Sequence, residues 1–176
     1  MSTNHRALIV IDIQNDYFPE GLFPLWNTEA TLTRIEQAVS WAHAAGWTVV
    51  LIKHISNSTA GTAPFFNPNT AGIELHSRIL AAAPDAPVVI KQFADSFYET
   101  NLDEVLLSHG VDELFVCGMM TQNCVTHTAI SKAAEKYQVS IISDCCTTVD
   151  QMIHNIALAG VVNRVPLVLL EAAFDQ

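Results

Sequence analysis

The 176-residue chain has 8 lysines and arginines against 18 aspartates and glutamates, a formal net charge of −10 at pH 7 with neutral histidines. With 50% apolar residues, a chain of this length is typical of one domain with a full core. The acidic balance argues against a nucleic-acid-binding protein, which needs a basic face, and against docking on an anionic membrane.

Membrane insertion, secretion and structural metal binding have no signal in the sequence. No apolar run reaches the roughly 18 to 20 residues of a membrane span, and residues 1–6 are polar, unlike a signal peptide. The 4 cysteines form no CxxC pair, so neither a disulfide framework nor a structural zinc site is indicated. We therefore expect a single domain over residues 1–176 that folds in the cytoplasm with free thiols.

Strand-like and helix-like segments alternate along the chain. Strands are predicted at residues 7–13, 48–55, 87–91, 113–118, 139–143 and 165–170, most of them continuous apolar runs of the kind covered on both faces of a parallel sheet. Helices are predicted between them, over 28–45, around 73–80, from Asn101, from Asn123 or Cys124, and over 149–159. This order predicts an α/β fold, a three-layer sandwich around a six-stranded, mainly parallel sheet with right-handed crossovers.

Two local signals mark helix ends. Asn101 followed by Glu104 resembles a capping box at a helix start. Gly46, Gly110 and Gly160 each follow a predicted helix, where a left-handed cap is expected.

One long irregular stretch, residues 56–71, is rich in Asn, Thr, Pro and Gly and carries Phe65 and Phe66. Long loops in compact domains are often functional, so this one could supply an aromatic wall to a site. An ordinary surface loop that tucks one phenylalanine inward accounts for it equally well.

Three chemically capable side chains lie at the carboxyl ends of predicted strands. Asp12 ends the first, Lys91 ends the third, and Cys124 follows the fourth strand and Gly118 at the start of a helix-like stretch. In an open α/β sheet these ends face one crevice, so we expect an Asp/Lys/Cys cluster. A helix start and a cationic neighbour both lower the pKa of a thiol, which would activate Cys124.

Each member of the cluster also has a simpler interpretation. Asp12 could accept backbone hydrogen bonds, Lys91 could mark where a strand meets water, and Cys124 could be an inert buried thiol. His127 lies three residues after Cys124, but a side chain one turn into the helix is expected to follow the helix surface. His54 could line the crevice or bind a metal, although no second ligand stands at a metal-like spacing.

Three sequence blocks, in order, resemble the isochorismatase-like cysteine hydrolase superfamily, which includes nicotinamidases and N-carbamoylsarcosine amidase. They are residues 7–17 (ALIVIDIQNDY), residues 88–91 (VVIK) with Phe97 following, and residues 116–125 (VCGMMTQNCV). The resemblance covers nearly the whole chain and implies that Asp12, Lys91 and Cys124 form a catalytic triad.

The resemblance carries further implications for the site. Asp12 would be the general base, Lys91 would hold Asp12 and the thiolate, and Cys124 would attack the carbonyl. The backbone N–H groups of Met120 and Cys124 would form an oxyanion hole, beside a cis peptide at Met119–Met120. No cofactor is implied, and the family usually assembles as homo-oligomers, dimers or tetramers, in which a neighbouring subunit can contribute to the pocket.

Two departures from the family's patterns narrow the activity. Nicotinamidases carry an Asp-x-His metal pattern after the second strand, where this chain has His54-Ile55-Ser56, so we expect no metal and no nicotinamidase activity. Members that cleave isochorismate tend to lack the cysteine, so Cys124 favours acyl chemistry over vinyl-ether hydrolysis.

The expected function is therefore a small-molecule amidase, or related hydrolase, that works through a thioester. An isochorismatase-type vinyl-ether hydrolase, a metal-assisted hydrolase using Asp12 and His54, and a non-catalytic binding module are the alternatives. The expected pocket walls are Tyr17, Trp26, His54, Phe65, Phe66 and Phe97.

Overall fold

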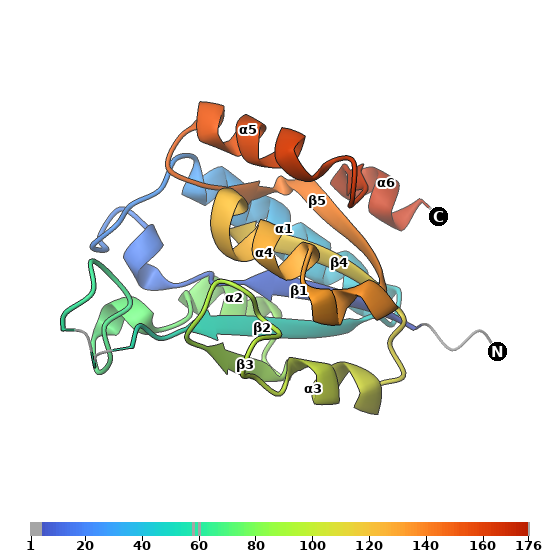
Figure 1. The fold of residues 1–176 in the computed structure, drawn as a ribbon, viewed down its shortest axis with the longest axis horizontal. Helices are drawn as coiled ribbons and strands as arrows, with labels where there is room; N and C mark the ends of the chain where they lie inside the picture. Colours follow the sequence, from blue (N-terminus) through green and yellow to red (C-terminus); the bar gives the residue numbers. More distant parts are fainter. Residues whose placement is uncertain (1–4, 58, 60, 176) are drawn as a thin grey trace.

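A parallel sheet in the order β3-β2-β1-β4-β5-β6 runs through the protein (Figure 1). The computed structural model describes residues 5–57, 59 and 61–175, which leaves out part of the polar N-terminal stretch and residues 58 and 60 of the long loop. The strands are β1 (Arg6–Ile11), β2 (Thr48–His54), β3 (Val88–Lys91), β4 (Glu113–Met119), β5 (Gln138–Thr147) and β6 (Leu167–Val168). The prediction of a six-stranded parallel sheet is confirmed.

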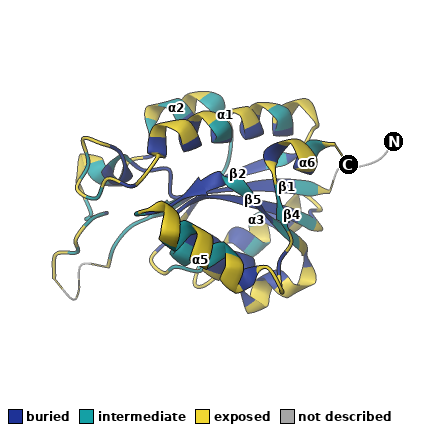
Figure 2. Ribbon diagram, turned by 90° about the horizontal axis from the view of Figure 1, so that it is seen from above, coloured by how far each residue is buried: buried dark blue, intermediate teal, exposed yellow. Residues whose placement is uncertain are grey.

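Helices cover both faces of the sheet and complete the three-layer sandwich (Figure 2). They are α1 (Thr28–Ala44), α2 (Ser77–Ala82), α3 (Leu102–Ser108), α4 (Thr126–Ala129), α5 (Gln151–Val161) and α6 (Leu170–Phe174), with 3₁₀ turns η1 (Asn15–Tyr17), η3 (Ala71–Ile73) and η5 (Lys132–Lys136) and a π-helical turn η4 (Thr121–Val125). The helices α1, α2 and α6 lie on one face, and α3, α4 and α5 on the other. None of the described helices is long and apolar enough to cross a bilayer.

The central strands are buried because helices pack on both of their faces. Residues 7–11 of β1 are no more than 1% exposed. The strand order reverses between β1 and β4, since β2 and β3 lie on one side of β1 and β4, β5 and β6 on the other. A reversal of this kind opens a crevice at the carboxyl ends of the strands.

Several predicted boundaries differ from the structure. β5 runs to Thr147, because a register shift after Val116 lets Cys146 and Thr147 pair with the end of β4. β6 is only two residues long, since the chain turns into the unpredicted helix α6 at Leu170.

The predicted caps are partly correct. Gly46 and Gly110 have the expected positive φ of 74° and 65°. Gly160 lies inside α5 and caps nothing, which corrects the prediction. The Asn101 side chain makes no cap hydrogen bond, because Thr100 Oγ1 accepts from the Leu102 N–H instead.

Candidate active site

Three strand ends bring Asp12, Lys91 and Cys124 to one edge of the sheet. Asp12 directly follows β1 and donates its backbone N–H to the Ile52 carbonyl of β2 at 3.0 Å. Lys91 is the last residue of β3, and Cys124 lies in the π-helical turn η4 after β4. The sequence prediction that the three meet in one crevice is in agreement with this placement.

Lys91 is the centre of the cluster. Its Nζ donates to Asp12 Oδ2 at 2.8 Å, to Cys124 Sγ at 3.2 Å and to the Phe93 carbonyl at 3.1 Å. Asp12, Lys91 and Cys124 are 0%, 1% and 2% exposed. Loss of either partner of such a buried ion pair strongly destabilises the folded protein, because the remaining charge is left buried and unpaired.

The electrostatics of the cluster leave Lys91 charged and Cys124 protonated. Burial opposes the ammonium charge, but Asp12 and Cys124 outweigh it and raise the pKa of Lys91. Burial, and then the carboxylate of Asp12, raise the pKa of the Cys124 thiol, while Lys91 lowers it by less. The sequence predicted a lowered thiol pKa; the structure corrects this, because nearly complete burial dominates.

Asp12 keeps one free acceptor for the thiol proton. Its Oδ1 is buried and has no hydrogen-bond partner among the described residues. An oxygen of this carboxylate and the Cys124 sulfur lie within 4.8 Å of each other. The geometry therefore suits a base that takes the proton at the moment of attack rather than a preformed thiolate.

The turn that carries Cys124 begins at a cis peptide between Met119 and Met120, as the family resemblance implies. The Met120 carbonyl accepts from the Asn123 N–H at 3.1 Å and from the Val125 N–H at 3.3 Å, which holds the turn closed. The N–H groups of Met120 and Cys124 remain the predicted oxyanion donors. His127 Nδ1 instead bonds the Asn123 carbonyl at 2.8 Å on the exposed side of the turn, so it forms no dyad with Cys124.

His54, the last residue of β2, is a fourth polar member of the site. Its Nδ1 lies 2.9 Å from Lys91 Nζ, so it accepts from the ammonium and the ring proton resides on Nε2. Burial and then the charge of Lys91 lower the pKa of His54 to about 4. The ring is therefore neutral at physiological pH and can donate from Nε2.

A metal ion does not fit between Asp12, His54 and Cys124. These residues are the one group of potential ligand atoms found close together in the part of the chain that the structure describes. The Lys91 ammonium lies 2.8 Å from Asp12, 2.9 Å from His54 and 3.2 Å from Cys124, and so takes the position that a shared cation would need. A positive charge that belongs to the chain therefore already contacts one atom of each of the three residues.

A cavity of about 130 Å³ opens beside the Cys124 sulfur. Its aromatic walls are Tyr17, Phe65 and Phe66, whose ring centroids are 4.6 to 5.3 Å apart, and His54 and Asn123 also line it. Burial, and then the charges of Asp12 and Cys124, raise the pKa of Tyr17, so its hydroxyl keeps the proton.

Two of the predicted pocket residues lie elsewhere. Trp26 lies against His154 of α5, with ring centroids 6.3 Å apart, and Phe97 stacks on Tyr137 at 6.1 Å. Neither lines the cavity beside Cys124. Their aromatic rings fill space between elements, which a sequence pattern does not distinguish from a binding wall.

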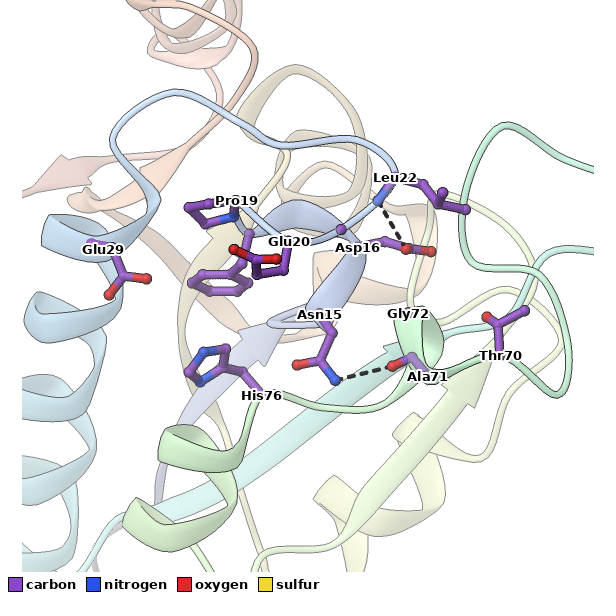
Figure 3. A pocket seen from close by; sticks show the side chains of 12 residues that line it. Asn15, Asp16, Pro19, Glu20, Leu22, Glu29, Thr70, Ala71, Gly72 and His76 are labelled. Carbon is purple, nitrogen blue, oxygen red and sulfur yellow. Dashed lines mark hydrogen bonds between the residues drawn. The ribbon is translucent and has the colours of Figure 1, made fainter.

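A larger hollow lies away from the cluster. It measures about 830 Å³ and is bordered by η1, the start of α1 and the chain around Gly72 (Figure 3). Glu29 on its rim pairs with Arg78, and Asp16 at its floor accepts from the Leu22 N–H. The hollow of about 830 Å³ is not lined by Cys124, whereas the cavity of about 130 Å³ is. The smaller cavity is therefore the better candidate for catalysis.

Two supporting residues were not recognised as part of the site from the sequence. Gln14 donates to the carbonyls of His54 and Ile73 and accepts from the His54 N–H, each at 2.8 Å. Asp16 accepts from the Phe66 N–H at 2.7 Å and so fixes the position of one cavity wall. The missed signal for Gln14 was a polar residue inside the apolar run that also contains Asp12.

Comparisons with a family model and with curated proteins point to the same family. The model of the Isochorismatase domain matches residues 6–171. The uncharacterized isochorismatase family protein YddQ of Bacillus subtilis is 36% identical over 149 residues, 85% of this chain and 81% of that protein. The nicotinamidase of Escherichia coli is 27% identical over 179 residues, with 82% of this chain and 84% of the relative covered.

Solved structures agree with the sequence matches. An isochorismatase family protein from Desulfovibrio vulgaris superposes with a TM-score of 0.86 at 25% identity, covering 97% of each chain.

Proposed function

Because the chain belongs to the isochorismatase family and is a hydrolase, we propose that it cleaves a C–N bond, amide or carbamoyl, of a small molecule through a thioester on Cys124. The observation that carries the proposal is the position of the Lys91 ammonium, which bonds both the Asp12 carboxylate and the Cys124 sulfur. A buried acid and a buried thiol that both bond to one cation are the parts that acyl transfer to sulfur requires.

The first half of the reaction forms the thioester. Asp12 Oδ1 takes the thiol proton as Cys124 attacks the carbonyl carbon, and Lys91 stabilises the sulfur as its charge develops. The N–H groups of Met120 and Cys124 stabilise the oxyanion. The tetrahedral intermediate then collapses, the C–N bond breaks, and protonated Asp12 returns the proton to the departing amine or ammonia.

The second half releases the acid. Asp12, ionised again, takes a proton from water as the water oxygen attacks the thioester carbon. The C–S bond breaks, the carboxylic acid leaves, and Asp12 returns the proton to the Cys124 sulfur. Lys91 stays charged throughout, since its raised pKa keeps the ammonium form.

Vinyl-ether cleavage of an isochorismate-like compound is the alternative. It proceeds by protonation of the enol ether and needs no thiol, so it leaves the contact between Cys124 and Lys91 without a purpose. An assay of isochorismate against a panel of amides and carbamoyl compounds separates the two. The metal-assisted alternative is not favoured, because Lys91 stands where the ion would bind.

The test is chemical modification combined with substitution. We expect iodoacetamide to modify Cys124 stoichiometrically, and Cys124→Ala to abolish turnover of any amide that the wild type hydrolyses. The other thiols, Cys117, Cys145 and Cys146, are also buried and serve as internal controls. Modification of Cys145 with Cys124 unreacted, or full activity of Cys124→Ala, contradicts the proposal.

The proposal extends to the setting of the enzyme. We place it in the cytoplasm, as one domain over residues 1–176, working without a cofactor and as a homo-oligomer. The cytoplasmic location is supported by the four cysteines, none of which forms a disulfide in the structure. Sedimentation of the purified protein tests the last.

A further inference from the structure

We propose that the acyl group bound beside Cys124 is uncharged and about as large as one six-membered ring, and that amides with an anionic acyl group are excluded. The inference rests on the proposed function and narrows its substrate class. It is carried by the walls of the cavity, the distribution of cations over the chain, and the volume available.

The cavity walls offer apolar surface and neutral donors. Tyr17, Phe65 and Phe66 supply three aromatic rings, and the neutral His54 directs its Nε2–H to the side not held by Lys91. The Tyr17 hydroxyl has no hydrogen-bond partner among the described residues and is available to a ligand oxygen. A carbonyl or other neutral acceptor satisfies these donors, whereas a carboxylate needs a cation.

No cation is available to pair with an anionic substrate. Lys91 already has four partners, and the sequence holds no lysine or arginine between Lys53 and Arg78, so the loop that walls the cavity carries none. The other basic side chains are engaged away from the cavity: Arg6, Arg34, Lys53, Arg78, Lys132 and Lys136 in ion pairs and Arg164 with the Ile130 carbonyl. Together with the net charge of −10, this disfavours anions at the site.

The volume sets the size of the acyl group. The cavity measures about 130 Å³. An apolar protein cavity of roughly 150 Å³ is known to hold a benzene molecule. A single ring or a branched chain of similar volume therefore fits in this cavity beside the sulfur, and a fused bicycle does not.

Charge selectivity is tested by a readout independent of turnover. We expect iodoacetamide to modify Cys124 faster than iodoacetate by about 30-fold or more, after each rate is divided by that of the same reagent with N-acetylcysteine, since burying an unpaired carboxylate costs several kcal/mol. Equal rates, or faster modification by iodoacetate, overturn the inference and leave the proposed function intact. Failure of both reagents to modify Cys124 contradicts the proposed function, and the inference falls with it.

A charge placed in the wall should change the preference. Ala63 lines the cavity, so Ala63→Arg is expected to reduce the preference for iodoacetamide at least tenfold. Leu80→Arg makes the same change of charge on α2, 43% exposed and outside the cavity lining, and should leave the preference unchanged. An equal effect of both variants would mean that net charge, not the cavity wall, sets the selectivity.

Size selectivity is tested with neutral amides. We expect hydrolysis of benzamide but not of 2-naphthamide, and Phe65→Ala should gain activity on the larger amide. Hydrolysis of both amides by the wild type at similar kcat/KM overturns the size limit.

A separate observation concerns α5, and from it we infer that α5 packs against α5 of a second copy of this chain. Met152, Ile156 and Gly160 follow one another at intervals of four residues, so they share one face of the helix. Met152 is 72% and Ile156 64% exposed, and the outer face of α5 is visible at the surface in Figure 2.

Gly160 and the absence of charge identify the partner as a second copy. A Cβ at Gly160 would meet no atom of the described residues within 4 Å and its φ is ordinary, so no packing within that part of the chain requires glycine at a helix position that it weakens. A closely approaching helix does require it. The helix contains no Asp, Glu, Lys or Arg, which makes it a face where two copies of a chain with a net charge of −10 can meet without repulsion.

Sedimentation velocity tests this surface. We expect the wild type to be a dimer, Ile156→Glu a monomer, and Leu107→Glu, an equally exposed apolar position on α3, still a dimer. In the Ile156→Glu background, Gly160→Ala should raise the melting temperature, whereas in the wild-type background it should weaken the dimer. A monomeric wild type, or a dimer that survives Ile156→Glu, overturns the inference.

Discussion

The burial of His54 and its contact with Lys91 predict an unusual dependence of stability on pH. Replacement of His54 by Gln removes the titrating ring and keeps an amide oxygen that can accept from Lys91 Nζ. In the folded wild type the pKa of His54 is about 4 instead of 6.5. The unfolded chain therefore binds a proton below pH 6.5 that the folded chain does not bind until about pH 4, and acidification over this range favours unfolding.

The magnitude follows from the two pKa values. At about 1.36 kcal/mol per pH unit, the difference between 6.5 and about 4 corresponds to a loss of about 3 kcal/mol of unfolding free energy below pH 4. Between pH 7 and pH 4.5 most of this loss, about 2 kcal/mol, should occur in the wild type and not in His54→Gln. Above pH 7 the ring contributes no pH dependence in either state.

Urea unfolding followed by tryptophan fluorescence measures the effect. The free energies of the wild type and His54→Gln should diverge by about 2 kcal/mol as the pH falls from 7 to 4.5. His127→Gln, which removes an exposed ring from the surface of η4 and α4, is the matched control. Parallel curves for the wild type and His54→Gln would show that burial and Lys91 do not hold His54 neutral, and the donor role of its Nε2 would fail.

Three further predictions concern the cluster and its support. Lys91→Met should lower the unfolding free energy by about 3 to 5 kcal/mol, because it leaves the Asp12 charge buried and unpaired; chemical denaturation measures this, and a smaller loss than 1 kcal/mol would contradict the ion pair. Asp12→Asn should reduce kcat on any amide substrate by about 10² to 10⁴, the contribution typical of a general base, with an unchanged near-UV spectrum; retained kcat would remove Asp12 from the mechanism. Gly72→Ala should destabilise the fold by about 1 to 3 kcal/mol in thermal unfolding, since its Cβ would lie 2.0 Å from Asp16 Oδ1, and an unaltered melting temperature would show that Asp16 does not fix this loop.

The layout of the site could be predicted because it depends on chain order and strand direction. Parallel strands must return to the same edge of the sheet, so Asp12, Lys91 and Cys124 were expected to meet there once the apolar runs were recognised as strands. The distances of 2.8 and 3.2 Å that join them at Lys91 Nζ agree with that expectation. Most of the strands, and with them the α/β fold, were predicted from the continuous apolar runs.

What the sequence did not predict depends on burial and on loop geometry. The pKa of Cys124 is set by how completely tertiary packing covers it, and a local helix-start argument gave the opposite direction. Phe66 points into the cavity because its backbone N–H bonds Asp16 across 50 residues of chain, while Phe97, equally apolar in sequence, stacks on Tyr137. The role of Gln14 is likewise visible only when residues 54 and 73 lie beside it.

The backbone of Asp12 limits how this site can evolve. Its φ of 54° is in the left-handed region, which Asp, Asn and Gly enter far more readily than other residues. A lineage that drifts away from hydrolysis is therefore expected to acquire Asn or Gly at this position, because both suit this backbone conformation while they remove the carboxylate. Glu keeps the charge but is disfavoured by this backbone conformation. Active descendants should therefore have Asp at this position, and inactive ones Asn or Gly.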